Sequence, residues 1–319
     1  MNRAIALQPP PAWVRLAAAI IPKLPAARYR AIARLCANPP KAFLMRMPER
    51  LGGFSYVCDL SDIMSQEICF TGKFEAQETA VFRALLRPGM TFVDVGGNWG
   101  YFTLLAASLV GKSGRVIAFE PDPRIHALLK DNIARNGLSH VTPLEIAASS
   151  ETGTLTLSGY QEDTNNYGVS RVIDPSSLEN GGRPGIRTFT VAARQVDAVL
   201  DDLGVAGVDL LKMDIEGAEV FALRGMTDGL AAHRYRRIVL ELHPALLKEH
   251  GQTAQEAFDL VKSAGYRAWR IDHSPATTRR VAYIENPALR ELLQPIESAS
   301  VLDSWPHLLW LAPGVEMTA

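Results

Sequence analysis

The chain has 319 residues, of which 47% are hydrophobic and 21% are charged, so it has the composition of an ordinary globular protein. Its 33 Lys and Arg residues balance 34 Asp and Glu residues, and we therefore expect no nucleic-acid partner. Three widely spaced cysteines, Cys36, Cys58 and Cys69, argue against a disulfide framework or a zinc site and predict a reducing, cytoplasmic location.

Residues 1–73 are expected to form an N-terminal lid of helices and short strands. Residues 12–37 mix apolar residues with Arg and Lys, but the apolar stretch before Pro22 is short and contains Arg15. Two interpretations are open: a helical lid that packs on the main domain, or a basic helix that rests on a membrane surface. Three short apolar segments then predict strands at 42–48, 54–61 and 67–72.

Residues 74–319 are expected to form the main domain. A helix is predicted at 75–90, and from residue 91 short apolar strands alternate with helical segments. Strands rich in Val, Ile, Leu and Phe are buried on both faces, and helices between them make parallel crossovers. The pattern therefore predicts a doubly wound, mostly parallel α/β sheet with strands at 91–95, 115–120, 141–149, 208–214 and 236–243. The Gly-, Ser-, Asn- and Pro-rich stretch 158–189 is expected to be a substrate loop.

The turn after the strand at 91–95 has the composition of a cofactor-binding loop. Its glycines let the backbone approach a ligand closely, and its asparagine tolerates a left-handed conformation. The helix that follows directs free N–H groups at whatever is bound. We therefore expect a cofactor to contact Asp94, Gly96, Gly97, Asn98, Gly100 and Tyr101.

The spacing of this turn indicates which cofactor it binds. The dinucleotide pattern Gly-x-Gly-x-x-Gly would need glycine where Val95 stands, which disfavours a nucleotide-dependent oxidoreductase. The pattern acidic-x-Gly-x-Gly-x-Gly fits with Asn98 in place of one glycine, and it is the loop of S-adenosylmethionine-dependent methyltransferases. The carboxylate of Asp94 repels a pyrophosphate but suits a cationic sulfonium and an ammonium group. Glu120, at the end of the next strand, suits the ribose hydroxyls of either ligand.

Four stretches together resemble the FkbM family of methyltransferases: 92–107, 116–133, 208–225 and 238–244. The resemblance implies a Rossmann-like, seven-stranded class I methyltransferase sheet, S-adenosylmethionine as cofactor, and O-methylation of a sugar, polyketide or similar small-molecule natural product. Trp99 stands where the family usually has a small aliphatic residue, so it either reshapes the substrate pocket or packs on the N-terminal lid. A non-catalytic adenosyl-binding protein in a glycan assembly is the alternative outside the enzymes.

Softer candidates surround these motifs. The residues after the second and third strands are expected to contact the ribose and adenine; they are Pro121, Asp122, Glu145 and Ala147. Polar residues of the substrate loop and of the preceding helix are candidates for contact with a hydroxylated acceptor; they are Asn165, Asn166, Tyr167, Glu75 and Glu78.

The ends of the strands at 208–214 and 236–243 carry the expected reaction site, formed by Lys212, Asp214, Glu216, Glu241 and His243. Lys212 and Asp214 are two apart in a strand and so face the same side. His243 is the best-placed general base by residue type, because the ordinary pKa of histidine lies near the working pH. Alternatively, Asp214 and Glu241 hold a divalent cation such as Mg²⁺, which acidifies the acceptor hydroxyl.

Overall fold

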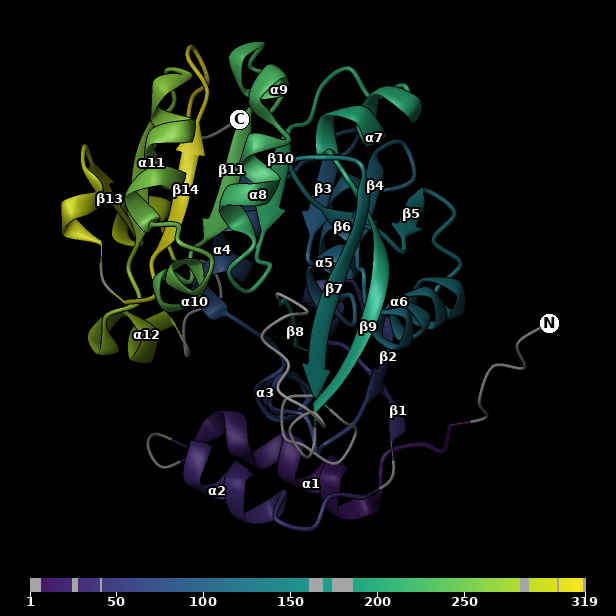
Figure 1. Cartoon of the computed structure of the whole chain (residues 1–319). Helices are drawn as coiled ribbons and strands as arrows, with labels where there is room; N and C mark the ends of the chain where they lie inside the picture. Colours follow the sequence, from purple (N-terminus) through teal and green to yellow (C-terminus); the bar gives the residue numbers. More distant parts are fainter. Residues whose placement is uncertain are drawn as a thin grey trace.

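A computed structural model describes residues 7–24, 28–40, 42–160, 169–173, 186–281, 287–302 and 304–317. An eight-stranded sheet forms its centre, in the order β13-β12-β14-β11-β10-β3-β4-β5 (Figure 1). Its strands are β3 (Thr91–Val95), β4 (Arg115–Phe119), β5 (Val141–Leu144), β10 (Leu210–Met213), β11 (Arg237–Glu241), β12 (Arg267–Ile271), β13 (Leu293–Ile296) and β14 (His307–Leu311).

The strands from β5 to β11 in this order are parallel, and β14 runs antiparallel between β11 and β12. This confirms the predicted doubly wound, mostly parallel sheet. The seven expected strands are joined by an eighth, β13, which pairs antiparallel with β12 at the edge. Strand order reverses between β3 and β10, and ligands of such sheets bind beyond the carboxyl ends of the strands at this point.

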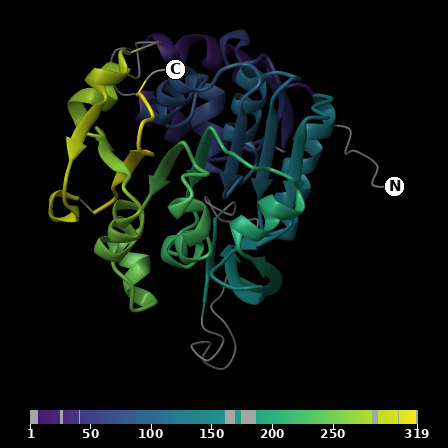
Figure 2. The same cartoon turned by 90° about the horizontal axis from the view of Figure 1, so that it is seen from above.

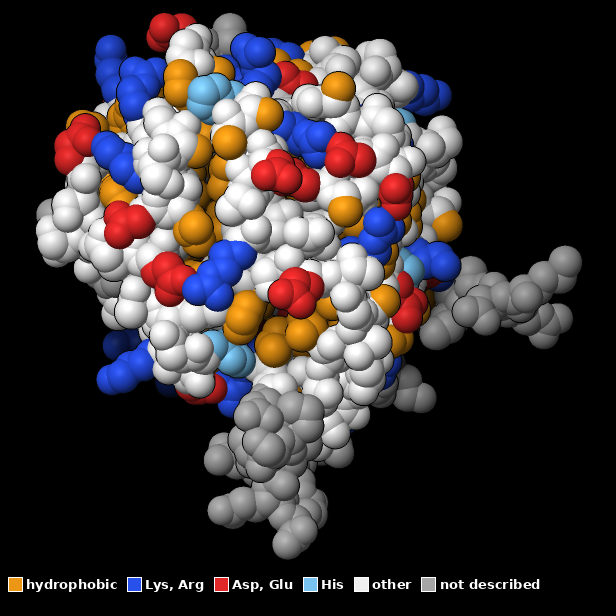
Figure 3. Space-filling model, turned by 45° about the horizontal axis from the view of Figure 1, so that its top comes forward, with side chains coloured by type: hydrophobic (Ala, Val, Ile, Leu, Met, Phe, Trp, Pro, Cys, Tyr) orange, Lys and Arg blue, Asp and Glu red, His pale blue; other side chains and the backbone are white. Residues whose placement is uncertain are grey.

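Helices cover both faces of the sheet (Figure 2). They are α4 (Ala76–Leu85), α5 (Tyr101–Val110), α6 (Pro123–Arg135), α7 (Val196–Asp202), α8 (Glu219–Arg224), α9 (Thr227–Ala231), α10 (Pro244–Glu249), α11 (Ala254–Ser263) and α12 (Pro275–Val281). Because both faces are covered, the central strands are apolar throughout: Phe92, Val93 and Val95 of β3 are fully buried. On the face shown in Figure 3, acidic and basic side chains are interspersed, and neither sign gathers in a large patch.

A second sheet is present where the sequence predicted the end of a strand at 141–149 and a loop at 158–189. Its order is β6-β9-β7-β8, with β6 (Ala147–Ala148), β7 (Gly153–Tyr160), β8 (Ser170–Val172) and β9 (Ile186–Arg194). The strand expected at 141–149 is divided between the two sheets, and the described parts of the expected loop at 158–189 belong mainly to strands. Apolar residues on one face of this sheet form a small core with β6, which explains the pairing; they are Ala147, Leu157, Val191 and Ala193. Asn165, Asn166 and Tyr167 lie outside the described residues.

The N-terminal region contains α1 (Ala12–Ile20), α2 (Arg28–Leu35), β1 (Phe43–Arg46), β2 (Ser55–Cys58) and α3 (Ile63–Thr71). The strands expected at 42–48 and 54–61 are present, but the one expected at 67–72 is wrong, because this segment ends α3. The carboxylate of Asp62 caps that helix by accepting a hydrogen bond from the Ser65 amide (3.0 Å), and Gly72 ends it in a left-handed conformation. The described residues also contain short 3₁₀ helices: η1 (Ile21–Lys23), η2 (Glu49–Leu51), η4 (Leu289–Glu291) and η5 (Ala299–Val301).

The helix α1 packs on the rest of the molecule through Val14, and η1 does so through Ile21; both side chains join a small core with Phe43, Cys58 and Phe70. The boundary at residue 73 stays a prediction. All three cysteines are free thiols. Within the described ranges, no helix combines the length and the apolar character that a membrane span requires.

Candidate active site

The turn between β3 and α5 is shaped by left-handed residues. Gly96, Asn98 and Gly100 have φ angles of 92°, 48° and 97°. Asn98 therefore adopts the left-handed conformation that asparagine was expected to tolerate here. The amide of Gly96 donates a hydrogen bond to the carbonyl oxygen of Phe119 (3.0 Å), which ties the turn to β4. A Cβ on Gly96 would lie 1.9 Å from the carbonyl oxygen of Asp214. Only glycine therefore fits at this position.

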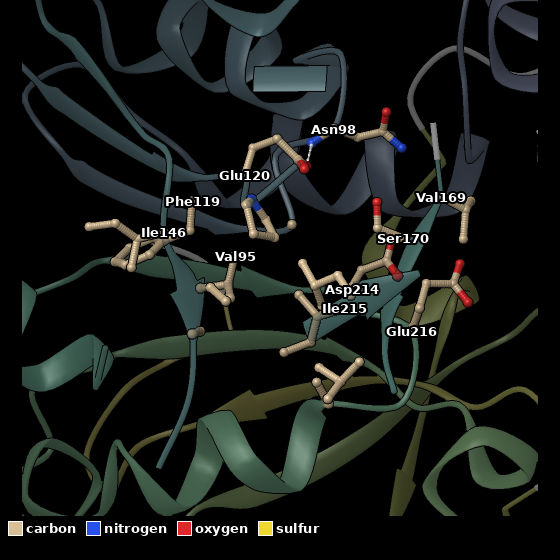
Figure 4. Close-up of a pocket in the computed structure, with 17 residues that line it drawn as sticks. Val95, Asn98, Phe119, Glu120, Ile146, Val169, Ser170, Asp214, Ile215 and Glu216 are labelled. Atoms are coloured by element: carbon tan, nitrogen blue, oxygen red, sulfur yellow. Dashed lines mark hydrogen bonds between the residues drawn. The ribbon is translucent and has the colours of Figure 1, made fainter. Parts of the chain in front are cut away.

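Glu120 supports the turn from the end of β4. Its buried carboxylate accepts hydrogen bonds from the amides of Asn98 and Asp122, both at 2.9 Å, and Figure 4 shows the bond from Asn98. Burial raises the pKa of Glu120 to about 8. A carboxylate oxygen has lone pairs for two hydrogen bonds and each oxygen of Glu120 uses one here, so the group still has capacity for two ribose hydroxyls.

A cavity lies beside this turn, and its empty space, including the open mouth, is about 660 Å³. Small-molecule sites typically measure ~300–1,000 Å³. Apolar Ile146 and Phe119 lie toward one end, and the carboxylates of Asp214 and Glu216 lie toward the other (Figure 4). The expected site residues that line it are Gly96, Asn98, Glu120, Pro121, Ala147, Asp214 and Glu216. Sequence reasoning missed the apolar wall and the rim formed by the second sheet, including Ile146, Leu157, Val169, Ser170, Val172 and Ile215.

Several expected cofactor residues lie in the core instead of on the cavity wall. The hydroxyl of Tyr101 is hydrogen-bonded to the hydroxyl of Thr79 (2.9 Å), so its side chain points away from the cavity. A Cβ on Gly100 would lie 2.7 Å from Leu129 of α6, so this glycine permits helix packing. Trp99 is fully buried and outside the cavity lining, which favours packing over a role in shaping the pocket.

Asp122 and Glu145 also make other contacts. The buried Asp122 caps α6, accepts a hydrogen bond from the Ser170 hydroxyl (3.0 Å) and forms an ion pair with Arg187 of β9. It therefore attaches the second sheet to the cofactor turn. Glu145 pairs with His126 (3.1 Å) outside the cavity lining. The side chains of Asp122 and Glu145 are thus occupied by partners within the protein, and this arrangement does not support their expected contacts with a cofactor.

Asp94 lies beneath the turn and is buried. One oxygen accepts a hydrogen bond from the Thr103 hydroxyl (2.6 Å), whereas Oδ1 has no hydrogen-bond partner within the described chain. Burial raises the pKa of this carboxyl to about 6. An unpartnered buried carboxylate oxygen beneath a glycine turn fits a ligand that carries an ammonium group. Together, the carboxylates of Asp94 and Glu120 and the close backbone approach at Gly96 suit S-adenosylmethionine, which carries an ammonium group and two ribose hydroxyls.

The reaction cluster begins at the end of β10. Lys212 is buried, and its ammonium group pairs with the carboxylate of Asp214 (3.1 Å). Burial by itself would lower the pKa of Lys212, but Asp214 and Asp94 raise it above the ordinary value. The pairing expected for a lysine at this sheet end is therefore present.

His243 stands at the centre of a group of carboxylates. Its ring is 2% exposed, and Nδ1 is hydrogen-bonded to Oε1 of Glu219 (2.7 Å). Nε2 lies 3.8 Å from Asp214 Oδ1, 3.6 Å from Glu216 Oε2 and 3.6 Å from Glu241 Oε1. Burial lowers the pKa of His243, but Glu219 and the other carboxylates outweigh it and raise the pKa to about 9. The expectation of a pKa near the working pH is wrong, and the ring carries a proton at neutral pH.

Glu216 and Glu219 are three residues apart at the start of α8 but have different surroundings. Glu216 lines the cavity with φ 52°, and burial together with Asp214 raises its pKa to about 7. Glu219 is fully buried and also accepts a hydrogen bond from the Gly217 amide (3.0 Å). Sequence reasoning missed Glu219, although a second acid at the start of the helix was the available signal.

The carboxylate of Glu241 is contacted by residues of β14 and of the segment just before this strand. It accepts a hydrogen bond from Trp305 Nε1 (2.6 Å) and lies 3.7 Å from His307 Nε2, its cross-strand neighbour on β14. The other ring nitrogen of His307 contacts the buried carboxylate of Glu78 (3.0 Å), which also pairs with His273 (2.7 Å). Glu78 is therefore a structural partner of two histidines. His307 and Trp305 lie beyond the segment that resembles the family, so no motif pointed to them.

The strand order, the antiparallel β14 and the glycine turn after β3 define a Rossmann-like class I methyltransferase. The methyltransferase FkbM domain matches residues 94–268, more than half of the chain. The chain belongs to the FkbM family.

Three curated relatives are similar to this chain in sequence. The chain is 30% identical over 211 residues to the AMB antimetabolite synthetase AmbE of Pseudomonas aeruginosa, covering 57% of this chain and 10% of AmbE. It is 30% identical over 197 residues to the 31-O-demethyl-FK506 methyltransferase FkbM of Streptomyces tacrolimicus, covering 53% and 74%. It is 26% identical over 153 residues to the hexuronic acid methyltransferase AglP of Haloferax volcanii, covering 47% and 54%. The match thus spans less than two thirds of two of these three proteins.

Proposed function

We propose that this chain is an S-adenosylmethionine-dependent O-methyltransferase that acts on a hydroxyl of a sugar, polyketide or similar small-molecule natural product. The observation that carries the proposal is one cavity that is lined both by the cofactor turn, through Gly96 and Asn98, and by Asp214 and Glu216. The names of the relatives FkbM and AglP, which refer to FK506 and to hexuronic acid, support this acceptor class. The free thiols support a cytoplasmic location.

The cofactor supplies a methyl group on a positively charged sulfur when it is bound. Asp94 and Gly96 would hold its methionine portion, Glu120 its ribose hydroxyls, and the apolar wall with Ile146 and Ala147 its adenine. Much of the rate enhancement would come from holding two reactants in one orientation.

Glu216 is the proposed proton acceptor. A hydroxyl must lose its proton as its oxygen forms the new bond to carbon, and a base works best when its pKa is close to the working pH. Glu216 lines the cavity and has a pKa of about 7, whereas His243 already carries a proton. The change Glu216→Gln should lower turnover by about 10²-fold and remove the rise of turnover with pH around 7. An unchanged pH profile would exclude Glu216 as the base.

A divalent cation is the second route to the same proton loss. Asp214 and Glu241 come together as expected, and Glu75 joins them, so that one oxygen from each lies within 4.8 Å of the others. Such a group of oxygen ligands suits Mg²⁺, which would acidify a bound hydroxyl. Loss of activity in a chelator and its recovery with Mg²⁺ would favour this route over Glu216 alone.

The test of the function is product formation. The full chain is incubated with S-adenosylmethionine and a panel of hydroxylated sugars and polyketides, and mass spectrometry records the mass added by one methyl group. Binding of S-adenosylhomocysteine without any product would favour the non-catalytic adenosyl-binding alternative. Tight binding of NADH without binding of S-adenosylhomocysteine would favour the oxidoreductase.

A further inference from the structure

The described part of the chain exposes few large apolar side chains, and most of them lie in the first two helices. Trp13, Leu16 and Ile20 of α1 and Leu35 of α2 are 38–64% exposed. Only Ile63 and Trp305 join them elsewhere in the described ranges. Trp13, Leu16 and Ile20 are three and four residues apart, so they form one stripe along α1, which we call the α1 stripe. The buried Val14 lies on another side of α1, and with Ile21 of η1 it already anchors this helix.

Charge is segregated in the same region. Residues 1–48 contain eight of the 33 basic residues and none of the 34 acidic ones, so this segment has a net charge of +8 and the remainder −9. Arg15, Lys23, Arg30 and Arg34 are exposed around the two helices. The near-zero charge of the whole chain therefore hides a strongly basic end.

We propose that α1 and α2 form a docking surface for an anionic lipid bilayer. Exposed Trp, Leu and Ile side chains beside Arg and Lys are the features of a helix that lies in the plane of a membrane surface. The apolar side chains enter the boundary between headgroups and acyl chains, while the basic side chains attract anionic headgroups. Nucleic acid would use the positive charge but would leave Leu16 and Ile20 in water.

This surface also bears on the site. Figure 1 shows α1 and α2 at the end of the molecule toward which the parallel strands point, which is the end that carries the cavity. Docking through these helices holds that end near the lipid. This consequence, which rests on the proposed function, favours acceptors that are themselves attached to or dissolved in a membrane.

Vesicle sedimentation of the full chain tests the docking surface without cofactor or acceptor. The chain should sediment with phosphatidylcholine vesicles that contain phosphatidylglycerol and stay in solution with pure phosphatidylcholine. The double change Arg30→Gln/Arg34→Gln should weaken binding about fivefold per charge. The matched control Lys112→Gln/Arg236→Gln removes two exposed charges beside the amino ends of β4 and β11, at the end of the sheet opposite to α1 and α2, and should leave binding unchanged.

The α1 stripe is tested by Leu16→Gln/Ile20→Gln, which should weaken binding about tenfold or more because two apolar side chains no longer enter the lipid. These residues are exposed, so the fold is retained, which circular dichroism verifies, and methylation of a dissolved acceptor should not change. Three results would overturn the proposal: failure to sediment with anionic vesicles, binding that is insensitive to the α1 stripe, and self-association in light scattering that Leu16→Gln/Ile20→Gln abolishes. The last would assign the surface to a second copy of the chain.

Discussion

The cofactor turn and the reaction cluster meet in one cavity but are built by different means. The cofactor turn, residues 94–100 with Glu120, is shaped by backbone conformation and by the absence of side chains. The reaction cluster at the ends of β10 and β11 is built from ionisable side chains that hold one another's charge. The cofactor turn should therefore lose its ligand when atoms are added to it, and the reaction cluster should lose activity when a charge or a proton site is removed.

The largest effect is expected from adding one methyl group to the turn. Gly96→Ala should abolish measurable binding of S-adenosylhomocysteine, because the new Cβ would collide with the Asp214 carbonyl and φ is left-handed. Gly97→Ala is the matched control, since its Cβ would lie 3.3 Å from Leu129 and 3.4 Å from Ala118. Calorimetry should find its affinity within about fivefold of the parent chain. Equal affinities for the two variants would contradict the steric account.

Removal of the central histidine should affect turnover and spare the cofactor. His243→Ala is expected to lower turnover by about 10²-fold or more, because three carboxylates lose the cation between them. Affinity for S-adenosylhomocysteine should be nearly unchanged. His140→Ala, at the amino end of β5 and far from the site, should leave both quantities intact. A His243→Ala variant with normal turnover would remove this residue from the reaction.

A smaller effect on turnover is expected from Glu219, the hydrogen-bond partner of His243. Glu219→Gln keeps the shape of the side chain but removes the charge that holds His243, so the pKa of His243 should fall from about 9 toward its ordinary value. NMR titration of the ring measures this shift directly. Turnover should drop by about tenfold, the effect typical of a residue that orients another. An unshifted pKa would show that Glu219 is only a packing partner.

The smallest effect concerns pH and the cofactor. Glu120 has a pKa raised to about 8 by burial, and its ionised form is the better acceptor for ribose hydroxyls. The carboxyl is protonated below this pKa and ionised above it, so affinity for S-adenosylhomocysteine should increase as pH rises through about 8. Calorimetry of Glu120→Gln should show a weaker affinity without this rise. A rise that persists in Glu120→Gln would assign the effect to another group.

The cofactor turn was predictable because its determinants are local. Which residues can adopt a left-handed conformation depends on the sterics of their own backbone, so such a turn can be read from the spacing of Gly and Asn after an apolar strand. In the structure, Gly96, Asn98 and Gly100 have this conformation. The partners of Tyr101, Asp122 and Glu145 were not predictable, because periodicity does not indicate where a side chain finds its partner. Each of them bonds to a residue from another element.

By itself, the sequence determined the doubly wound sheet, the family and the gathering of carboxylates at the ends of β10 and β11, because hydrophobic period and turn chemistry act over short stretches of chain. Only the tertiary structure decided the charge states and supporting contacts of the reaction cluster. The pKa of His243 depends on carboxylates from two strand ends and a helix, and Glu241 faces His307 only because β14 runs antiparallel beside β11. Burial and distance set these energies, and both arise when distant segments pack together.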